Sequence, residues 1–358
     1  MAMRLASVRL RNVGPFDDTI VRFVAESHGA PDDEAQPPRP VTVLFGGDGT
    51  GKTSLLAAVG LTRPGYALPP LPSSRERTDA EPPSVTAEWI LGEDDPERPH
   101  PLVVASPTVI LPGESPEAAA VRRREQALFD KRAQQEGGFV FVAFSGARWF
   151  SRSSTVLTTP DRTVLRYDVR APVSFDDPTR ADLTRETKQT LVYAAVAHAL
   201  GRGRAETMHL AHFDEAVREV ASAMLEPFGF TYEGIGATTL EPQARDAAGR
   251  VVPFDALPRA ARHLLAFGVI PLRALFAAYP RSDAPREHEG VVAIDDVEVQ
   301  QDPSFLRGMI PLLRRALPNV QWLLSTASTQ LALACEAGEV VALRRQGERV
   351  EASEEVLQ

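Results

Sequence analysis

The stretch that decides the fold is GGDGTGKT, Gly46–Thr53, which matches the pattern G-x-x-x-x-G-K-[ST] at every fixed position. The apolar run Val41–Phe45 precedes it and predicts a buried strand, and the segment Lys52–Gly60 predicts a helix directly after it. Glycines let the backbone turn its N–H groups inward around phosphate oxygens, and a helix N-terminus adds a positive end. The stretch therefore predicts a phosphate-binding loop between a strand and a helix.

The side chains of this loop predict a nucleotide with a metal ion. Lys52, one of only three lysines among 39 basic residues, offers a mobile positive charge to β- and γ-phosphates. Thr53 offers a hydroxyl oxygen to Mg²⁺. We therefore expect ATP and Mg²⁺ as ligands, and the choice between ATP and GTP stays open. The expected nucleotide-binding residues are Gly46, Gly47, Asp48, Gly49, Thr50, Gly51, Lys52, Thr53 and Ser54.

A second apolar run, Val291–Ile294, ends in two carboxylates, Asp295 and Asp296. The carboxyl ends of parallel strands point at a shared crevice, so this strand end is expected beside the phosphate loop. Asp295 would then be a ligand of Mg²⁺, and Asp296 would be the catalytic carboxylate near the attacking water. A third buried strand, Val320–Leu324, should reach the same crevice. The alternative for the two carboxylates is a solvated strand-to-loop turn.

The rest of the chain predicts an α/β fold, with the βαβ rhythm strongest at its two ends. We expect one domain over residues 1–358, with an N-terminal lobe at 1–111, a variable and partly helical insertion at 112–245, and a C-terminal lobe at 246–358. Strands are expected at Met3–Phe23 (a hairpin), Val85–Leu91, Leu102–Leu111, Phe139–Phe144, Thr231–Leu240, Arg250–Phe254 and Val340–Arg344. Helices are expected at Glu114–Gly137, Asp182–Leu200, Leu210–Phe228, Pro258–Tyr279, Pro303–Ala316 and Gln330–Ala337.

These pieces, in this order, resemble the compact RecF-like, OLD-like and SMC-like branch of the ABC-type ATPases, a P-loop NTPase class. Met3–Phe16 is similar to the opening of that family, and the phosphate loop corresponds to its Walker A motif. Ile294–Pro303 resembles its "hDE-x-E-x-x-x-HP" stretch, and Trp322–Ser328 resembles its "hhhh-T-H-S" switch. The resemblance covers roughly the first 60 and the last 100 residues. It implies a mixed, largely parallel sheet with flanking helices, an N-terminal antiparallel β-piece and a helical insertion.

The chain departs from this family at the residues tied to hydrolysis. Asp296 stands at the position of the catalytic glutamate and is one methylene shorter, and a misplacement of about 1 Å can cost ~10²-fold in rate. Ala327 stands at the switch histidine and cannot form its side-chain hydrogen bond. Asp302 replaces the histidine of "HP", and Pro258–Ala260 replaces the Ser-x-Gly of the signature motif. Nucleotide binding is therefore expected to be intact, and hydrolysis slow or absent.

The resemblance implies an AAA-type ATP-binding protein that forms a homodimer through the nucleotide. Such a protein would drive or gate a separate effector or nuclease in DNA repair and maintenance or in antiviral (phage) defence. The alternative is a nucleotide-gated pseudo-ATPase scaffold with no significant turnover. A nucleotide kinase is a third alternative, which the order of the Asp295–Asp296 strand disfavours. Glu298 matches the second acidic position of the family, with a plain loop carboxylate as its alternative.

Composition limits the remaining functions. The net charge of −9 argues against a general nucleic-acid coat, so any DNA contact would be local. No apolar run reaches the ~18 residues of a membrane span, and the single cysteine, Cys335, fits a reducing compartment, so we expect a cytoplasmic protein without a membrane segment. Candidate phosphate-backbone contacts, with a solvated surface as their alternative, are Arg122–Arg124, Lys131, Arg132, Arg148, Arg152, Arg162, Arg166 and Arg170. Arg148 could instead face the nucleotide, and His209 with His212 is a weak candidate for a metal pair.

Overall fold

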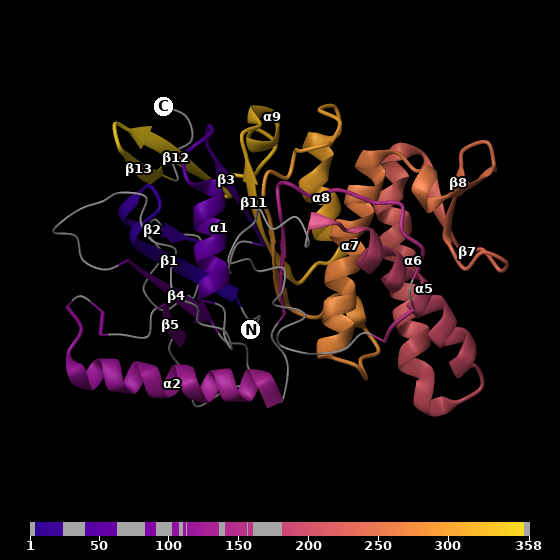
Figure 1. Ribbon diagram of the computed structural model, residues 1–358, viewed down its shortest axis with the longest axis horizontal. Coiled ribbons are helices and arrows are strands. Elements are labelled where there is room, and N and C mark those ends of the chain that lie inside the picture. The colour runs from indigo at the N-terminus through magenta and orange to yellow at the C-terminus, as the bar shows by residue number, and fades with distance from the viewer. Residues whose placement is uncertain are drawn as a thin grey trace.

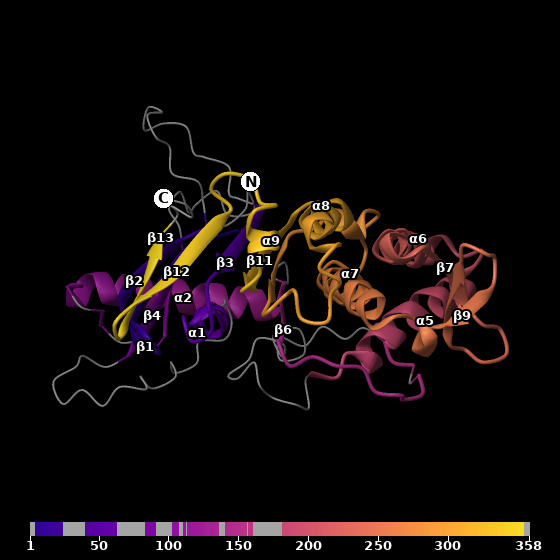
Figure 2. The same ribbon diagram turned by 90° about the horizontal axis from the view of Figure 1, so that it is seen from above.

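The computed structural model describes residues 4–23, 40–62, 83–90, 102–106, 110–111, 113–135, 140–155, 157–159 and 181–353. Within this part of the chain, a six-stranded sheet lies between an antiparallel sheet at one end of the molecule and a group of helices at the other (Figure 1). A view turned by 90° shows the same succession along the long axis (Figure 2). The structure is therefore the mixed α/β fold expected from the sequence.

The six-stranded sheet has the strand order β13-β12-β3-β11-β10-β6. Its strands are β3 (Val41–Phe45), β6 (Phe141–Phe144), β10 (Gly290–Ile294), β11 (Val320–Thr326), β12 (Val340–Gln346) and β13 (Arg349–Ser353). All neighbouring pairs are parallel except β12 with β13. The strand that precedes the phosphate loop thus lies at the centre of the sheet, two places from the strand that ends in the paired aspartates. The expectation of a buried, largely parallel sheet is confirmed.

The strands β3, β6, β10, β11 and β12 divide their side chains between two apolar cores. On β10, Val292 and Ile294 belong to a core shared with the helices, whereas Val291 and Ala293 belong to a core shared with the antiparallel sheet. Successive side chains of a strand point to opposite faces, so a strand covered on both faces is apolar at every position. This accounts for the continuous apolar runs in the sequence.

The antiparallel sheet has the order β2-β1-β4-β5 and packs with helix α1 (Lys52–Leu61) against one face of the six-stranded sheet. Its strands are β1 (Arg4–Val13), β2 (Phe16–Arg22), β4 (Ser84–Ile90) and β5 (Leu102–Ser106), and helix α2 (Pro116–Gln135) runs below β5 (Figure 1). The buried Gln321 amide joins the two sheets, because it donates to the Leu5 carbonyl and accepts from the Leu5 N–H. The expected N-terminal hairpin is confirmed as β1 and β2.

The opposite face of the six-stranded sheet is covered by helices. Helices α7 (Arg259–Ala278) and α8 (Leu306–Ala316) lie next to the sheet (Figure 1), with the short α9 (Thr329–Ala332) after β11. Helices α5 (Thr184–Gly201) and α6 (Met208–Leu225) pack on the outer side of α7 (Figure 2). Helix α7 is long and apolar enough to cross a membrane, but 83% of its most apolar window is buried inside the molecule, as in the core helix of a water-soluble fold. Phe213 and Phe276 stack at 4.0 Å between ring centroids and join α6 to α7.

Two expectations about the middle of the chain need correction. A small antiparallel sheet contains β7 (Phe230–Ile235), β8 (Pro242–Asp246) and β9 (Val251–Pro253), so the single strand expected at Thr231–Leu240 is shorter and β8 was missed. Leu240 has a positive φ of 54° and lies in the turn that separates β7 from β8. Strand β6, inside the segment 112–245 assigned to an insertion, pairs with β10 in the six-stranded sheet. The division into lobes otherwise stays a prediction.

Candidate functional site

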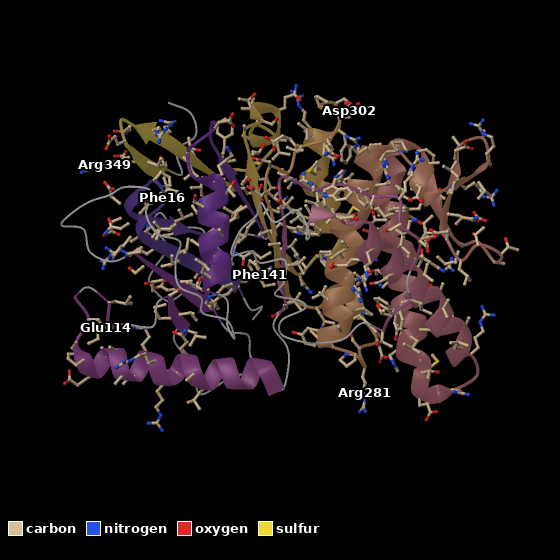
Figure 3. All side chains as sticks on the ribbon, in the orientation of Figure 1. Phe16, Glu114, Phe141, Arg281, Asp302 and Arg349 are labelled. Carbon is tan, nitrogen blue, oxygen red and sulfur yellow. The ribbon has the colours of Figure 1, made fainter. Side chains whose placement is uncertain are left out.

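The phosphate loop owes its shape to glycines in left-handed backbone conformations. Gly49 has a φ of 74° and Gly51 a φ of 86°, a region in which residues with a Cβ are strained. A Cβ on Gly51 would lie 2.6 Å from the Pro15 side chain and 2.8 Å from the ring of Phe16, which Figure 3 labels beside α1. The turn between β1 and β2 therefore packs directly on the loop where α1 begins, and only glycine fits there.

The loop holds its lysine on the inside. Lys52 is buried, and its Nζ donates to the carbonyl oxygens of Gly46 at 2.9 Å and Gly47 at 3.0 Å. The Thr50 hydroxyl donates to the Gly47 carbonyl at 2.8 Å and tightens the same turn. Backbone oxygens thus hold the ammonium within the loop. A bound phosphate would compete with these oxygens for its hydrogen bonds.

The acidic strand end meets the loop as expected. The parallel register pairs Ile294 with Leu324 and Thr326 with Phe45, which aligns the ends of β10, β11 and β3. Asp295 is 3% exposed, and its Oδ2 accepts from the Thr53 hydroxyl at 2.9 Å. The structure therefore brings together the two residues that the sequence assigns to Mg²⁺.

Burial raises the pKa of Asp295 above its usual range, and hydrogen bonds from Ser325 and Thr53 oppose that rise. The Ser325 hydroxyl donates to Asp295 Oδ1 at 2.5 Å. A hydroxyl and a carboxylate are the hard oxygen donors that Mg²⁺ takes when phosphates and water complete its octahedron, so this pair fits the ion. Among the described residues, no group of three or more His, Cys, Asp and Glu could hold a metal by itself.

Asp296 lies next to this pair in an unusual backbone conformation. Its φ is 43°, and its N–H donates to the Ser325 hydroxyl at 2.8 Å. Its carboxylate packs over Gly146, because a Cβ there would lie 3.0 Å from Asp296 Oδ2. Burial raises the pKa of Asp296, and the negative charges of Asp295 and Glu298 raise it further. The site thus concentrates carboxylates whose charge a metal ion would neutralise.

These elements enclose a cleft of about 460 Å³. Its lining residues are Val13, Gly14, Pro15, Asp48, Gly49, Gly51, Lys52, Thr53, Ser54, Ala58, Leu61, Asp296 and Arg345. Seven of the expected site residues line it, whereas Gly46, Gly47, Thr50 and Asp295 lie outside the lining. Sequence reasoning missed Arg345 and the turn Val13–Pro15, which lies inside the segment Met3–Phe23 expected to be a hairpin.

Arg148 has a different role from those expected for it. It is 1% exposed, and its guanidinium donates to five backbone carbonyls, those of Ser145, Asp295, Asp296, Val297 and Val299, at 2.6–3.3 Å. The guanidinium also lies 5.0 Å from the ring centroid of Phe267 on α7. Burial lowers the pKa of Arg148 to about 10. This residue faces neither nucleotide nor DNA and instead holds the loop after β10 in place.

The departures from the family at the switch, the HP pair and the signature motif form backbone and side-chain contacts in the structure, and none of these positions lines the cleft. The Ala327 N–H donates to Glu298 Oε1 at 2.7 Å, so the switch segment is tied to the acidic loop through its backbone. Asp302, at the rim above α8 (Figure 3), accepts from the backbone and hydroxyl of Ser304. Pro258 precedes the first residue of α7. The segment Pro258–Ala260 is therefore at a helix start, as a signature motif would be.

The other candidates for DNA or metal binding that the structure describes form contacts within the protein. Arg122 pairs with Glu114 at 2.8 Å, and His212 pairs with Asp283 at 3.2 Å. His198 rather than His209 contacts Asp214, and among the described residues the histidine pair belongs to no group of three or more potential metal ligands. Arg162, Arg166 and Arg170 lie outside the described residues, as do the side chains of Lys131 and Arg132.

A second lysine is fully buried. Lys188 on α5 is 1% exposed and donates to Asp255 Oδ2 and Glu241 Oε2, both at 2.9 Å, and to the Ser153 carbonyl at 3.1 Å. Asp255 lies three residues before Pro258. Lys188 therefore anchors the chain that leads into α7.

Strand order, phosphate loop and acidic strand end together define a P-loop NTPase fold of the ABC-ATPase type. No protein-family model and no curated protein matches the sequence. Among solved structures, the chain is similar to an SmcHead bound to the C-winged helix domain of ScpA (13% identity, 98% of this chain and 97% of that one, TM-score 0.51). It is also similar to the SMC head domain from Thermotoga maritima (12%, 98% and 98%, TM-score 0.47) and to the recombination mediator protein RecF of the RecFOR pathway (12%, 98% and 98%, TM-score 0.41). The chain thus has the fold of an SMC head domain, and the resemblance found in the sequence is confirmed at the level of fold.

Proposed function

We propose that this protein binds ATP with Mg²⁺ in the cleft between the phosphate loop and the acidic strand end. The observation that carries the proposal is the hydrogen bond of 2.9 Å between Thr53 Oγ1 and Asp295 Oδ2, which joins two segments 242 residues apart. Lys52 would bind the phosphates, and the N-terminal turn Val13–Pro15 would border the rest of the nucleotide. Mg²⁺, held by Thr53 and Asp295, would neutralise phosphate charge and raise the reactivity of the terminal phosphoryl group.

We propose further that hydrolysis is slow. Asp296 is the carboxylate that would orient the attacking water, but its backbone is in a left-handed conformation and its side chain packs over Gly146. Ala327 brings no side-chain donor to the terminal phosphate. We therefore expect the binding residues to hold the nucleotide, while two contributions to transition-state stabilisation are weakened.

By analogy of fold, the nucleotide would join two copies of the chain and gate a separate partner protein in the cytoplasm. The similar SmcHead structure contains a head bound to a domain of another protein, ScpA, which supports a search for a separate partner. DNA maintenance is the role we favour, and phage defence is the alternative setting. The second candidate function is a pseudo-ATPase scaffold in which ATP closes the dimer without turnover, and Ala327 favours it.

Binding of labelled ATP in the presence of Mg²⁺ tests the first part of the proposal. The wild-type chain should bind, and Lys52→Ala should reduce affinity by about 100-fold, because charge-assisted bonds to phosphate are among the strongest hydrogen bonds. Arg281→Ala is the matched control, because it removes an exposed cation that does not line the cleft, and it should bind as the wild type does. Equal affinity of wild type and Lys52→Ala would overturn the assignment of the site.

Phosphate release and light scattering, measured with and without ATP, test the second part. We expect ATP-dependent dimerisation with turnover well below ~1 s⁻¹, the low end of ordinary enzymes. Turnover at or above that rate would contradict slow hydrolysis. Dimerisation with no turnover at all would favour the scaffold, and a chain that stays monomeric with ATP would contradict both forms of the proposal.

A further inference from the structure

Arg345 enters the candidate nucleotide cleft from β12, a strand that the motifs do not include. Strand β12 pairs with β3, the strand that leads into the phosphate loop. Leu343 and Arg345 lie on the same face of β12, because their positions differ by two. A Cβ on Gly46 would lie 2.7 Å from the Leu343 carbonyl, and one on Gly49 would lie 3.8 Å from Arg345 Nη1. This face of β12 thus follows the phosphate loop from its base to its tip.

The guanidinium of Arg345 is exposed in the cleft. In the part of the chain that the structure describes, it takes part in no hydrogen bond or ion pair, unlike Arg349 on the next strand, which binds Asp17 at 2.8 Å. Arg344, on the opposite face of β12, lies across from Glu351 in the ladder. Arg345 is therefore a cation without a side-chain partner among the described residues, at the rim of a site that we assign to a polyanion.

The charges of the cleft lining favour a ligand for this cation. Lys52 and Arg345 are its two cations, and Asp48 and Asp296 are its two anions. Lys52 already donates to two backbone carbonyls. Asp296 lies in the acidic group around Asp295. Arg345 has no such acceptor among the described residues. A guanidinium offers paired donors that match two oxygens of one phosphate, which a lysine cannot do.

We propose that Arg345 binds the phosphate chain of the nucleotide at the tip of the loop, beside Gly49. The inference rests on the proposed function and adds a residue to that site. Lys52 would hold the phosphates from inside the loop, and Arg345 would cover them from β12. The strand next to the phosphate loop would then contribute directly to nucleotide affinity.

Affinities of ATP, ADP and inorganic tripolyphosphate, each with Mg²⁺, test this contact in the full chain. Arg345→Ala should weaken all three by about tenfold, which equals about 1.4 kcal/mol. Arg345→Lys should recover part of the loss, because it restores the charge without the paired donors. Arg344→Ala, on the neighbouring residue of the same strand, is the matched control and should bind as the wild type does.

The outcomes separate this inference from the function on which it rests. If the wild type binds ATP, Lys52→Ala loses binding and Arg345→Ala equals the wild type, the proposed function stands and the role of Arg345 is overturned. If Arg345→Ala weakens ATP but leaves tripolyphosphate unchanged, the residue contacts the base or ribose and the phosphate contact is wrong. If the wild type binds none of the three ligands, both proposals fail.

Discussion

The two sides of the cleft are built in different ways. The phosphate loop is shaped mostly by its own residues: Lys52 and Thr50 bond to carbonyls at most six residues away, and two glycines supply the left-handed turns. The acidic side is shaped by distant residues, since the loop after β10 is held by Arg148, 147 residues before Asp295, and by Ser325 from β11. The phosphate loop can therefore be identified from a local sequence motif. The contacts of Arg148 and Ser325 that position Asp295 cannot, because they join residues far apart in the chain.

The two sides also differ in charge. The loop side presents Lys52 and the amino end of α1, whereas the acidic side gathers Asp295, Asp296 and Glu298, two of which have raised pKa values. A polyanion suits the first side and a divalent cation suits the second. A nucleotide with Mg²⁺ satisfies both sides. The substitutions below compare how strongly a single residue on each side affects stability and nucleotide binding.

The largest effect is expected from Arg148→Met on the acidic side. The substitution leaves five carbonyl oxygens without their donor in a buried region, which should lower the free energy of unfolding by about 3–5 kcal/mol. Urea unfolding followed by circular dichroism measures the change. Arg152→Met removes an exposed arginine four residues away and should stay within about 0.5 kcal/mol of the wild type. Similar losses in the two variants would contradict a special role for Arg148.

A smaller effect is expected from Gly51→Ala on the loop side. The new methyl group would meet Pro15 and the buried Phe16 at a φ of 86°, which should cost about 2–3 kcal/mol of stability and most of the nucleotide affinity. Gly249→Ala is the matched control, because Gly249 has a similar φ of 79°, lies outside the cleft, and an added Cβ there meets nothing within 4 Å. Thermal unfolding with and without ATP separates the two quantities. A Gly249→Ala variant that loses as much stability as Gly51→Ala would show that the packing of the hairpin turn on the loop is unimportant.

The sequence predicted the locally built phosphate loop better than the acidic side, which distant residues hold in place. The limits of β3 and the start of α1 matched the expectation, because buried apolar runs and a glycine-rich turn are short-range signals. The approach of Asp295 to Thr53 was predicted only through the rule that parallel strand ends share a crevice. The burial of Arg148 was not predictable, because nothing in the sequence around it distinguishes it from the many other arginines. Four of its five acceptors lie about 150 residues away in the chain. Arg345 was missed because strand pairing, which no motif encodes, places it beside the loop.

A pH-dependent effect is expected behind the acidic side, at His263 on α7. This imidazole is fully buried, and burial, with the charge of Arg148 adding to it, lowers its pKa from 6.5 to about 3. The folded protein keeps His263 neutral, while the unfolded chain takes up a proton near pH 6.5, so stability is complete above that pH and is lost progressively toward pH 3. Between pH 7 and 5.5 the loss from this residue should be about 1 kcal/mol.

Urea unfolding at the two pH values checks this contribution by comparing the wild type with His263→Gln. The variant should lose about 1 kcal/mol less than the wild type over this interval, whatever its stability at pH 7. The amide can still donate toward the Arg259 carbonyl, which His263 Nδ1 contacts at 2.8 Å. An identical pH dependence in both proteins would show that His263 is protonated in the folded state.

The smallest effect is expected from Asp296→Asn, and its sign distinguishes function from stability. The wild-type carboxylate lies near Asp295 and Glu298 with a φ of 43°, a conformation that asparagine tolerates well. Removal of the charge should therefore stabilise the fold at pH 7 by about 0.5–1 kcal/mol, while any ATP turnover should fall by roughly 100-fold because the water loses its base. Asp48→Asn, at the exposed tip of the loop, should change stability by less than about 0.5 kcal/mol. A destabilised Asp296→Asn variant would mean that the Asp296 carboxylate stabilises the fold. The acidic side, like the phosphate loop, would then depend on its own side chains for its structure.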